Sequence, residues 1–398
     1  MRALLVSENL QDAHNLEPVG SELLARGWEV TLVSLEKFYG VPATDAAADR
    51  GFEVAVLEPK HDHDRLGGLS QSGRFRQLRE ILSQTAPIED LVGSADATIC
   101  STPGPLQRSF AAIAAAAGKP AYCIQEGLVA PRGGTRQARV KRALVRTATR
   151  GVALVGGLLG VDALRGRGDA KPFNGFTNVF AMGEDSVPHL IAQGADPDSV
   201  VVTGIPRFAD LFTMDSTFEG QDSAVLFLGG AFRWHGDLLG DRLQQSEVEV
   251  LVETAIERGW HLRIRPHPRE ADGTYLDYED TVTVSSPERN LLDDLLEASA
   301  VVSLTSTSIL EAIILGRIGV FAAPAFFPLG WQEPWIVAPG MAGATELIRQ
   351  ALDSSQTAAI QRRQRDFAES IISPESAFSA ATIADLIASA TGLPSAGS

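Results

Sequence analysis

The sharpest chemical pattern in the chain is a histidine between two prolines. Residues 261–270 have the sequence HLRIRPHPRE, and the strand predicted there ends at Arg265. Proline continues neither a strand nor a helix, so His267 is held at the carboxyl end of that strand. Because Arg265 and Arg269 flank the imidazole, and guanidinium groups pair well with phosphate oxygens, the pattern predicts a phosphate-binding loop that also includes Pro268. The alternative is a rigid turn with an incidental histidine.

A second pattern is a turn rich in hydroxyl groups, where a predicted buried strand runs into a helix. Residues 301–312 have the sequence VVSLTSTSILEA. The hydroxyls of Ser306, Thr307 and Ser308, together with free backbone N–H groups, suit an anion, and Glu311 is placed to reach a ribose hydroxyl. Plain helix capping by Ser306 or Thr307 is the alternative.

Two further loops follow predicted strands. Gly229 and Gly230 end the strand at 224–228 and allow backbone to approach a nucleotide, although a plain tight turn has the same residues. Glu126 follows the apolar run AYCI and is flanked by Gln125 and Gly127. A carboxylate there is a candidate general base for an acceptor hydroxyl, with a solvated loop glutamate as the alternative.

Other chemistries find little support in the sequence. A Walker A loop, a Gly-x-Ser-x-Gly elbow and a dinucleotide fingerprint are all missing from it. His61 and His63 alternate with aspartates, but no Cys/His cluster accompanies them. We therefore expect neither a metal site nor a cofactor.

The elements that must position these residues alternate along the chain. Expected strands are Ala3–Ser7, Glu29–Ser34, Glu53–Leu57, Ala97–Ser101, Ala121–Gln125, Asn178–Met182, Val200–Thr203, Ala224–Leu228, His261–Arg265, Thr281–Val284, Ala300–Leu304 and Ile318–Ala322. Expected helices are Glu17–Arg26, Phe75–Leu91, Leu106–Ala117, Val140–Thr149, Ser246–Arg258, Leu291–Ala298, Ile309–Leu315 and Gly343–Leu352, with two more between Thr357 and Ala390. Apolar strands alternating with helices predict parallel sheets covered on both faces, and such sheets bind ligands at the carboxyl ends of their strands.

A polar stretch from Phe212 to Ser223 predicts the link between two such domains. We expect an acceptor-side domain over 1–212, a nucleotide-binding domain over 213–375, and a terminal helix over 376–398 that packs back toward the first domain. Both domains are expected to be doubly wound and Rossmann-like, facing each other across a cleft.

Charge and composition narrow the partners. The 398 residues carry a net charge of −16, which argues against nucleic acid. Cys100 and Cys123 lie in apolar runs and are expected to be buried free thiols. The chain begins with a strand pattern, and no apolar stretch approaches the ~20 residues that span a bilayer, so we expect a cytoplasmic protein.

One stretch departs from the acidic background. Residues 132–171 carry a net charge of +8 beside an apolar run. This stretch is expected to dock on the anionic inner face of a membrane or on an anionic acceptor, unless it is simply a solvated helix face.

Taken together, these motifs resemble those of GT-B glycosyltransferases, in particular bacterial surface-polysaccharide transferases that use CMP- or CDP-activated donors, such as the bacterial sialyltransferases and polysialyltransferases. Their acidic-glycine, His-Pro and Ser/Thr motifs are similar to Glu126-Gly127, His267-Pro268 and Ser306-Thr307-Ser308 here, in the same order. One difference is that the acidic motif often has two acidic residues, whereas this chain has Gln125 first.

The resemblance implies an inverting, metal-independent transfer of a sugar, sialic-acid-like or otherwise CMP-activated, to a glycan or lipid-linked polysaccharide. His267 would assist the leaving phosphate, and Glu126 would deprotonate the acceptor. Three alternatives stay open. The turn at 203–207 and the Arg-Pro-His-Pro loop also resemble teichoic-acid glycerophosphotransferases that use CDP-alditols; the layout resembles nucleotide-sugar 2-epimerases more loosely; and a non-catalytic nucleotide-sugar-binding protein would share the same loops.

Overall fold

The chain folds into two compact units. In the computed structural model, the described residues are 1–8, 10–39, 49–60, 71–101, 103–127, 172–214, 223–233, 237–268, 270, 275, 278, 280–286, 288–323, 331, 333–353 and 357–392. Unit 1 comprises Met1–Asp210 and Ile371–Ser398, and unit 2 comprises Leu211–Ser370. The boundaries expected from sequence were 212/213 and 375/376, a few residues further along the chain. The helix expected at Val140–Thr149 and the basic stretch at 132–171 lie outside the described residues.

Unit 1 is built on a seven-stranded parallel sheet in the order β3-β2-β1-β4-β5-β6-β7. Its strands are β1 (Arg2–Ser7), β2 (Glu29–Ser34), β3 (Glu53–Val56), β4 (Ala97–Cys100), β5 (Ala121–Ile124), β6 (Asn178–Ala181) and β7 (Val200–Val202). Its helices are α1 (Leu10–Ala25), α2 (Glu36–Tyr39), α3 (Gln71–Ser94), α4 (Pro105–Ala116), α7 (Val187–Ala192) and α14 (Ser379–Ala390). Short 3-10 turns lie at Glu184–Ser186, Pro197–Ser199, Pro206–Phe208 and Pro374–Phe378, and α8 (Ala209–Thr213) leads into unit 2.

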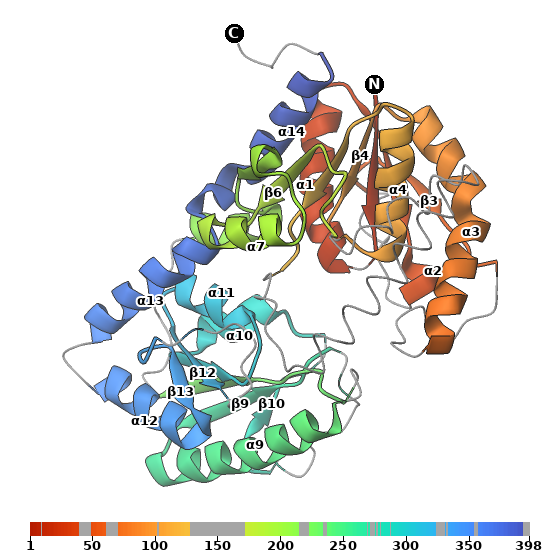
Figure 1. Ribbon diagram of the computed structural model, residues 1–398. Coiled ribbons are helices and arrows are strands. Elements are labelled where there is room, and N and C mark those ends of the chain that lie inside the picture. The colour runs from red at the N-terminus through yellow and green to blue at the C-terminus, as the bar shows by residue number, and fades with distance from the viewer. Residues whose placement is uncertain are drawn as a thin grey trace. The chain divides into compact units, whose positions relative to one another are not determined.

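Helices cover both faces of this sheet. One face packs on α3, α4 and α7 through a buried cluster that includes Val6, Cys100, Phe110 and Leu190. The opposite face is covered by α1, and α14 lies against α1 (Figure 1). Because both faces are buried, the inner strands β1, β4 and β5 have nearly continuous apolar sequences.

Unit 2 repeats the plan with six parallel strands in the order β10-β9-β8-β11-β12-β13. Its strands are β8 (Ala224–Leu228), β9 (His261–Arg265), β10 (Thr283–Val284), β11 (Ala300–Ser303), β12 (Ile318–Ala323) and β13 (Val337–Pro339). Its helices are α9 (Leu238–Arg258), α10 (Leu291–Glu297), α11 (Ser308–Ile314), α12 (Gly340–Asp353) and α13 (Thr357–Ile371). Helices α9 and α12 cover one face through residues such as Val248, Leu251, Met341 and Ile348, and Figure 1 shows α10 and α11 on the other face.

The expected fold class is confirmed, since both units are doubly wound parallel sheets. Strands β2, β8 and β9 have the expected bounds, and β13 was not expected.

In the described part of the chain, no single helix is long and apolar enough to cross a membrane, and the pair Thr357–Ile371 and Pro374–Ala390 reaches that length only together, by length and composition alone.

Candidate functional site

Three of the predicted loops lie side by side at the carboxyl edge of the unit 2 sheet. Leu228 at the end of β8 is in register with Arg265 of β9 on one side and with Ser303 of β11 on the other. The loops after these strands carry Gly229–Gly230, His267 and Ser306–Ser308. The chain winds outward from β8 through β9 to β10, then returns to β11 on the other side of β8. Loops at such a reversal form the usual ligand site of an open α/β sheet.

The hydroxyl-rich turn is built by its own serines. The Ser303 hydroxyl donates to the Leu228 carbonyl at 2.7 Å and accepts from the Ser306 N–H at 3.1 Å. The Ser306 hydroxyl accepts from the Ser308 N–H at 3.4 Å, and the Ser308 hydroxyl donates to Glu311 Oε1 at 3.0 Å. The turn therefore has a fixed shape, and the side chains from Ser306 to Ser308 stay half-buried, within reach of solvent.

Arg265 takes part in an ion network on the face of the sheet that carries α10. Its Nη1 lies 2.6 Å from Oδ2 of Asp294, whose side chain is fully buried, and its Nη2 donates to the Arg289 carbonyl at 2.8 Å. Arg289 also pairs with Asp294, at 2.6 Å. The guanidinium of Arg265 is thus engaged inside the protein, so a direct role for it on phosphate stays a prediction.

His267 is held by backbone contacts with Glu270. The His267 N–H donates to Glu270 Oε2 at 2.6 Å, and the Glu270 N–H donates back to the His267 carbonyl at 2.8 Å. His267 is half-buried and Pro268 is exposed, while Arg269 lies outside the described residues. The loop is therefore a closed turn that presents the histidine at the sheet edge.

The two glycines make room for side chains of the protein itself. A Cβ on Gly229 would lie 2.5 Å from Glu270 Oε2 and 3.0 Å from the Tyr275 hydroxyl. A Cβ on Gly230 would lie 2.9 Å from the Phe232 ring. The need for glycine here is explained by these contacts, and approach of a nucleotide to the same loop stays a prediction.

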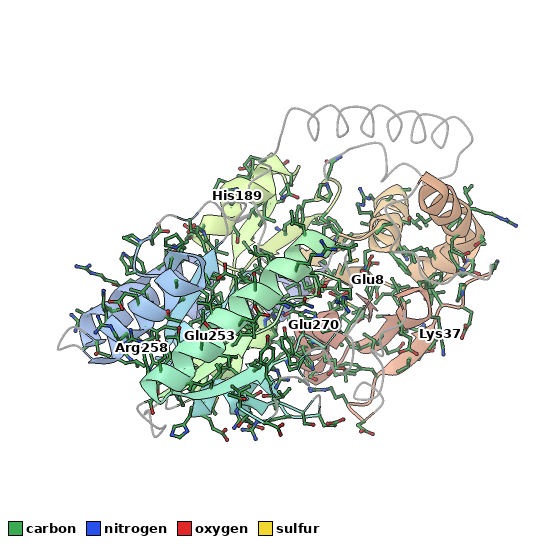
Figure 2. The ribbon with its side chains drawn as sticks, turned by 90° about the horizontal axis from the view of Figure 1, so that it is seen from below. Glu8, Lys37, His189, Glu253, Arg258 and Glu270 are labelled. Atoms are coloured by element: carbon green, nitrogen blue, oxygen red, sulfur yellow. The ribbon has the colours of Figure 1, made fainter. Side chains whose placement is uncertain are left out.

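Sequence reasoning missed the group that joins these loops, namely Gln244 of α9, Glu270 and Tyr275. Gln244 Nε2 donates to Glu270 Oε1 at 2.7 Å, and the Tyr275 hydroxyl donates to the same oxygen at 3.1 Å. Figure 2 shows Glu270 beside α9. Burial raises the pKa of Glu270 above its ordinary value, although its hydrogen bonds act in the opposite direction. The only available signal was the closeness of Glu270 to the Pro-His-Pro unit.

In unit 1, the predicted Gln125 positions the loop that carries Glu126. Gln125 is buried; its Nε2 donates to the Gly127 carbonyl at 2.8 Å and to the Ser186 hydroxyl at 2.9 Å. Its Oε1 accepts from the Met182 N–H at 2.9 Å. Glu126 follows directly and is half-buried at the carboxyl edge of the sheet, where a base could meet a substrate.

The same edge of unit 1 has further polar groups that the sequence did not point to. Glu8 follows β1, which is separated from β5 by β4 alone (Figure 2 labels Glu8). Gln107, in the first turn of α4, is fully buried, and within the described part of the chain neither atom of its amide has a hydrogen-bond partner. A Cβ on Gly104 would lie 2.0 Å from Glu8 Oε1 and 2.4 Å from Gln107 Oε1. These groups surround the point where the strand order of unit 1 reverses.

Two other expectations concern cysteine and metal. Cys100 and Cys123 are buried free thiols, as predicted, and burial raises the pKa of both. Among the residues that the structure describes, no group of three or more His, Cys, Asp or Glu side chains could hold a metal ion. The tract with His61 and His63 lies outside the described residues.

A hollow of about 730 Å³ lies at the opposite, amino edge of the unit 2 sheet, lined by residues that include Val225, Trp260, His261 and Asp294. None of the predicted site residues lines it. The hollow is therefore separate from the candidate site at the carboxyl-edge loops.

Comparison with known proteins supports the fold. No family model matches the chain, and no curated protein sequence matches it significantly. Among solved structures, the glycosyltransferase of kitacinnamycin is similar over 99% of both chains, with 15% identity and a TM-score of 0.66. The calicheamicin glycosyltransferase is similar over 98% of both chains, with 16% identity and a TM-score of 0.61. The UDP-GlcNAc 2-epimerase from Neisseria meningitidis, solved with UDP-GlcNAc, covers 97% of this chain and 100% of its own, with 17% identity and a TM-score of 0.58. At such identities the likeness shows the fold, which is the GT-B fold that these glycosyltransferases and epimerases share.

Proposed function

We propose that the chain is a nucleotide-sugar-dependent glycosyltransferase whose unit 2 binds the donor nucleotide at the carboxyl edge of its sheet. The observation that carries this proposal is the register of β9, β8 and β11, which brings the histidine, glycine and hydroxyl-rich loops together where the strand order reverses. The donor phosphate would meet His267 and the hydroxyls and backbone N–H groups of Ser306–Ser308. These are hydrogen-bond donors suited to a phosphate leaving group.

We further propose the roles that the sequence motifs suggest. His267 donates a proton or a hydrogen bond to the leaving phosphate, Glu126 removes the proton of the acceptor hydroxyl, and Glu311 binds the ribose. Inverting transfer of this kind requires no metal and no cofactor. The acceptor is a cell-surface glycan or a lipid-linked polysaccharide, and the protein works in the cytoplasm, attached to the inner membrane face through 132–171.

The proposal also concerns which base the donor nucleotide carries. The sequence motifs favour CMP, with sialic acid or another CMP-activated sugar as the cargo, whereas a solved structure of similar fold is described with UDP-GlcNAc. The test is to measure the melting temperature of the protein with CMP, CDP, UDP and GDP. A nucleotide at ~100 times its dissociation constant adds ~2.7 kcal/mol of stability, and the largest shift identifies the base.

We expect replacement of the site serines to weaken nucleotide binding. In the double variant Ser306→Ala/Ser308→Ala, the loss of two hydroxyls should cost about 1 kcal/mol of binding free energy for each lost hydrogen bond. Calorimetric titration with the nucleotide that gives the largest shift measures this effect. Ser246→Ala on the exposed side of α9 is the control and should bind as the wild type does. Equal affinity in all three proteins would refute the proposed site.

A nucleotide-sugar 2-epimerase is the second candidate, because an enzyme of that class is similar to this chain along its whole length. Incubation with a donor alone separates the two functions. An epimerase converts a UDP-sugar without acceptor, whereas a transferase forms its glycoside product only when acceptor is present. A chain that binds nucleotide and does neither would be a binding protein.

A further inference from the structure

The carboxylate of Glu270 is surrounded by donors. Oε2 accepts from the His267 N–H at 2.6 Å, and Oε1 accepts from Gln244 Nε2 at 2.7 Å and from the Tyr275 hydroxyl at 3.1 Å. The three donors belong to His267 in the loop after β9, to Gln244 of α9, and to Tyr275, which lies five positions after Glu270. An ionised carboxylate can accept all three bonds, whereas a protonated one loses part of its accepting capacity.

Gln244 extends this contact to the glycine loop. Its Oε1 accepts from the Gly230 N–H at 2.7 Å, while its Nε2 donates to Glu270 and lies 3.0 Å from the Tyr275 hydroxyl. The Gly229 N–H donates to the Arg265 carbonyl at 2.9 Å. The glycine loop and the histidine loop are thus joined through one buried amide and one carboxylate.

The fit at Gly229 shows how closely the carboxylate approaches the glycine loop. A Cβ at this position would lie 2.5 Å from Glu270 Oε2, which is shorter than any real Cβ contact. A larger residue at position 229 would therefore have to displace the Glu270 carboxylate. Such mutual fit is expected of groups that hold a site in shape.

We propose that Glu270 is a positioning residue that fixes the His267 loop against the Gly229–Gly230 loop, and that its ionised form keeps the site competent for a nucleoside phosphate. The role in nucleotide binding rests on the proposed function, whereas the contact between the His267 loop and the glycine loop does not. Glu270 acts through the backbone of His267, and its carboxylate oxygens accept hydrogen bonds from the protein's own groups.

The surroundings of Glu270 make this contact sensitive to pH. Burial raises its pKa, and the nearby negative charge of Asp241 on α9 acts in the same direction, while Arg233 pairs with Asp241 at 2.8 Å. Among the residues that the structure describes, Tyr275, Gln244 and His267 also face it. As pH falls, the carboxylate gains a proton earlier than an ordinary glutamate and weakens its bond to the His267 N–H.

The direct test follows the backbone amide of His267 by NMR as a function of pH in the full chain. Wild type should show a titration step with a midpoint above 4.5, the ordinary value for glutamate, and Glu270→Gln should abolish that step. Tyr275→Phe keeps the carboxylate but removes one donor, so the midpoint should move upward. A His267 amide without a carboxylate step, or a step that survives in Glu270→Gln, would overturn the proposal.

Nucleotide binding provides the second measurement. Glu270→Gln should weaken the binding of the nucleotide that shifts the melting temperature most. The difference in nucleotide affinity between wild type and variant should become smaller as pH is lowered. Wild-type affinity in Glu270→Gln at neutral pH would contradict the positioning role. If wild type binds none of the four nucleotides, the proposed function fails by itself, and the amide titration still decides the contact between Glu270 and His267.

Discussion

At the residue scale, Gln125 shows how one amide determines the shape of the loop that carries Glu126. Its NH₂ group donates to the Gly127 carbonyl and to the Ser186 hydroxyl, and its oxygen accepts from the Met182 N–H. An ionised carboxylate has no proton to donate and could not make the first two bonds. Glutamine at position 125 is therefore explained by its hydrogen bonds to Gly127, Ser186 and Met182.

Gln125→Glu should destabilise unit 1 because it buries a charge and removes two donated hydrogen bonds. We expect a loss of roughly 1–3 kcal/mol in the free energy of unfolding, measured by urea denaturation at neutral pH. Gln245→Glu, on the exposed face of α9, makes the same chemical change in solvent and should have almost no effect. A variant at 125 as stable as the control would contradict the role given to this amide.

Residues of the candidate site differed in how far the sequence could place them. The positions of His267 and Ser306–Ser308 after strand ends could be predicted because their neighbours along the chain, prolines and a buried strand, determine where they lie. Gln244 could not, because its partner Glu270 is 26 positions away and the contact exists only once α9 packs on the sheet. Arg265 was predicted to reach phosphate, but its pairing with Asp294, 29 positions away, was not visible in the sequence.

At the element scale, the ion network between β9 and α10 stabilises the frame of the site. Asp294 is fully buried and lies within 2.6–3.4 Å of guanidinium nitrogens from Arg263, Arg265 and Arg289. Burial by itself would raise the pKa of Asp294, but the hydrogen bonds from Arg265 and Arg289 lower it below the ordinary value. The network joins the strand that ends at the histidine loop to the helix on the same face of the sheet.

Asp294→Asn should destabilise unit 2 by roughly 2–4 kcal/mol at neutral pH. The half-buried Arg265 loses its carboxylate partner, while Arg263 and Arg289 keep their ion pairs with Glu297. A lowered pKa means that the carboxylate stabilises the fold above pH 3.8, its ordinary value, and that this stability is lost as pH falls through the lower folded value. Denaturation at pH 7 and at pH 3 measures the effect. The difference in the free energy of unfolding between wild type and variant should be smaller at pH 3 than at pH 7. An equal difference at both pH values would contradict a stabilising role for the ionised carboxylate.

The bounds of strands and helices could be predicted from the sequence where burial requires apolar residues. Strands β2, β8 and β9 have the expected bounds because each is a short run of buried or alternating apolar residues. Helix α9 begins eight positions before the expected start. Its first turns hold exposed residues such as Leu239, which is 74% exposed, so the sequence there has no apolar stripe from which a helix could be predicted. Strand β13, with three residues, was too short for its pattern to be seen.

At the scale of the whole molecule, the chain leaves unit 1, forms unit 2 and returns to unit 1. Helix α14 packs on α1 (Figure 1), and Arg26 Nη2 lies 2.9 Å from Asp385 Oδ1. Gly204, with φ of +66°, lies so close to Ser376 that a Cβ would be 2.4 Å from its backbone nitrogen. The returning segment thus completes unit 1, close to where the sequence placed a terminal helix packing back.

The central claim is that unit 2 binds the nucleotide at its carboxyl-edge loops. The most direct measurement is backbone hydrogen exchange of the full chain with and without the nucleotide that raises the melting temperature most. Binding should slow exchange in 229–233, at the His267 amide and in 304–308, and leave the amino edge of the same sheet, at 280–283 and 296–298, unchanged. Protection confined to the amino edge or to unit 1, or no protection by any of CMP, CDP, UDP and GDP, would contradict the claim.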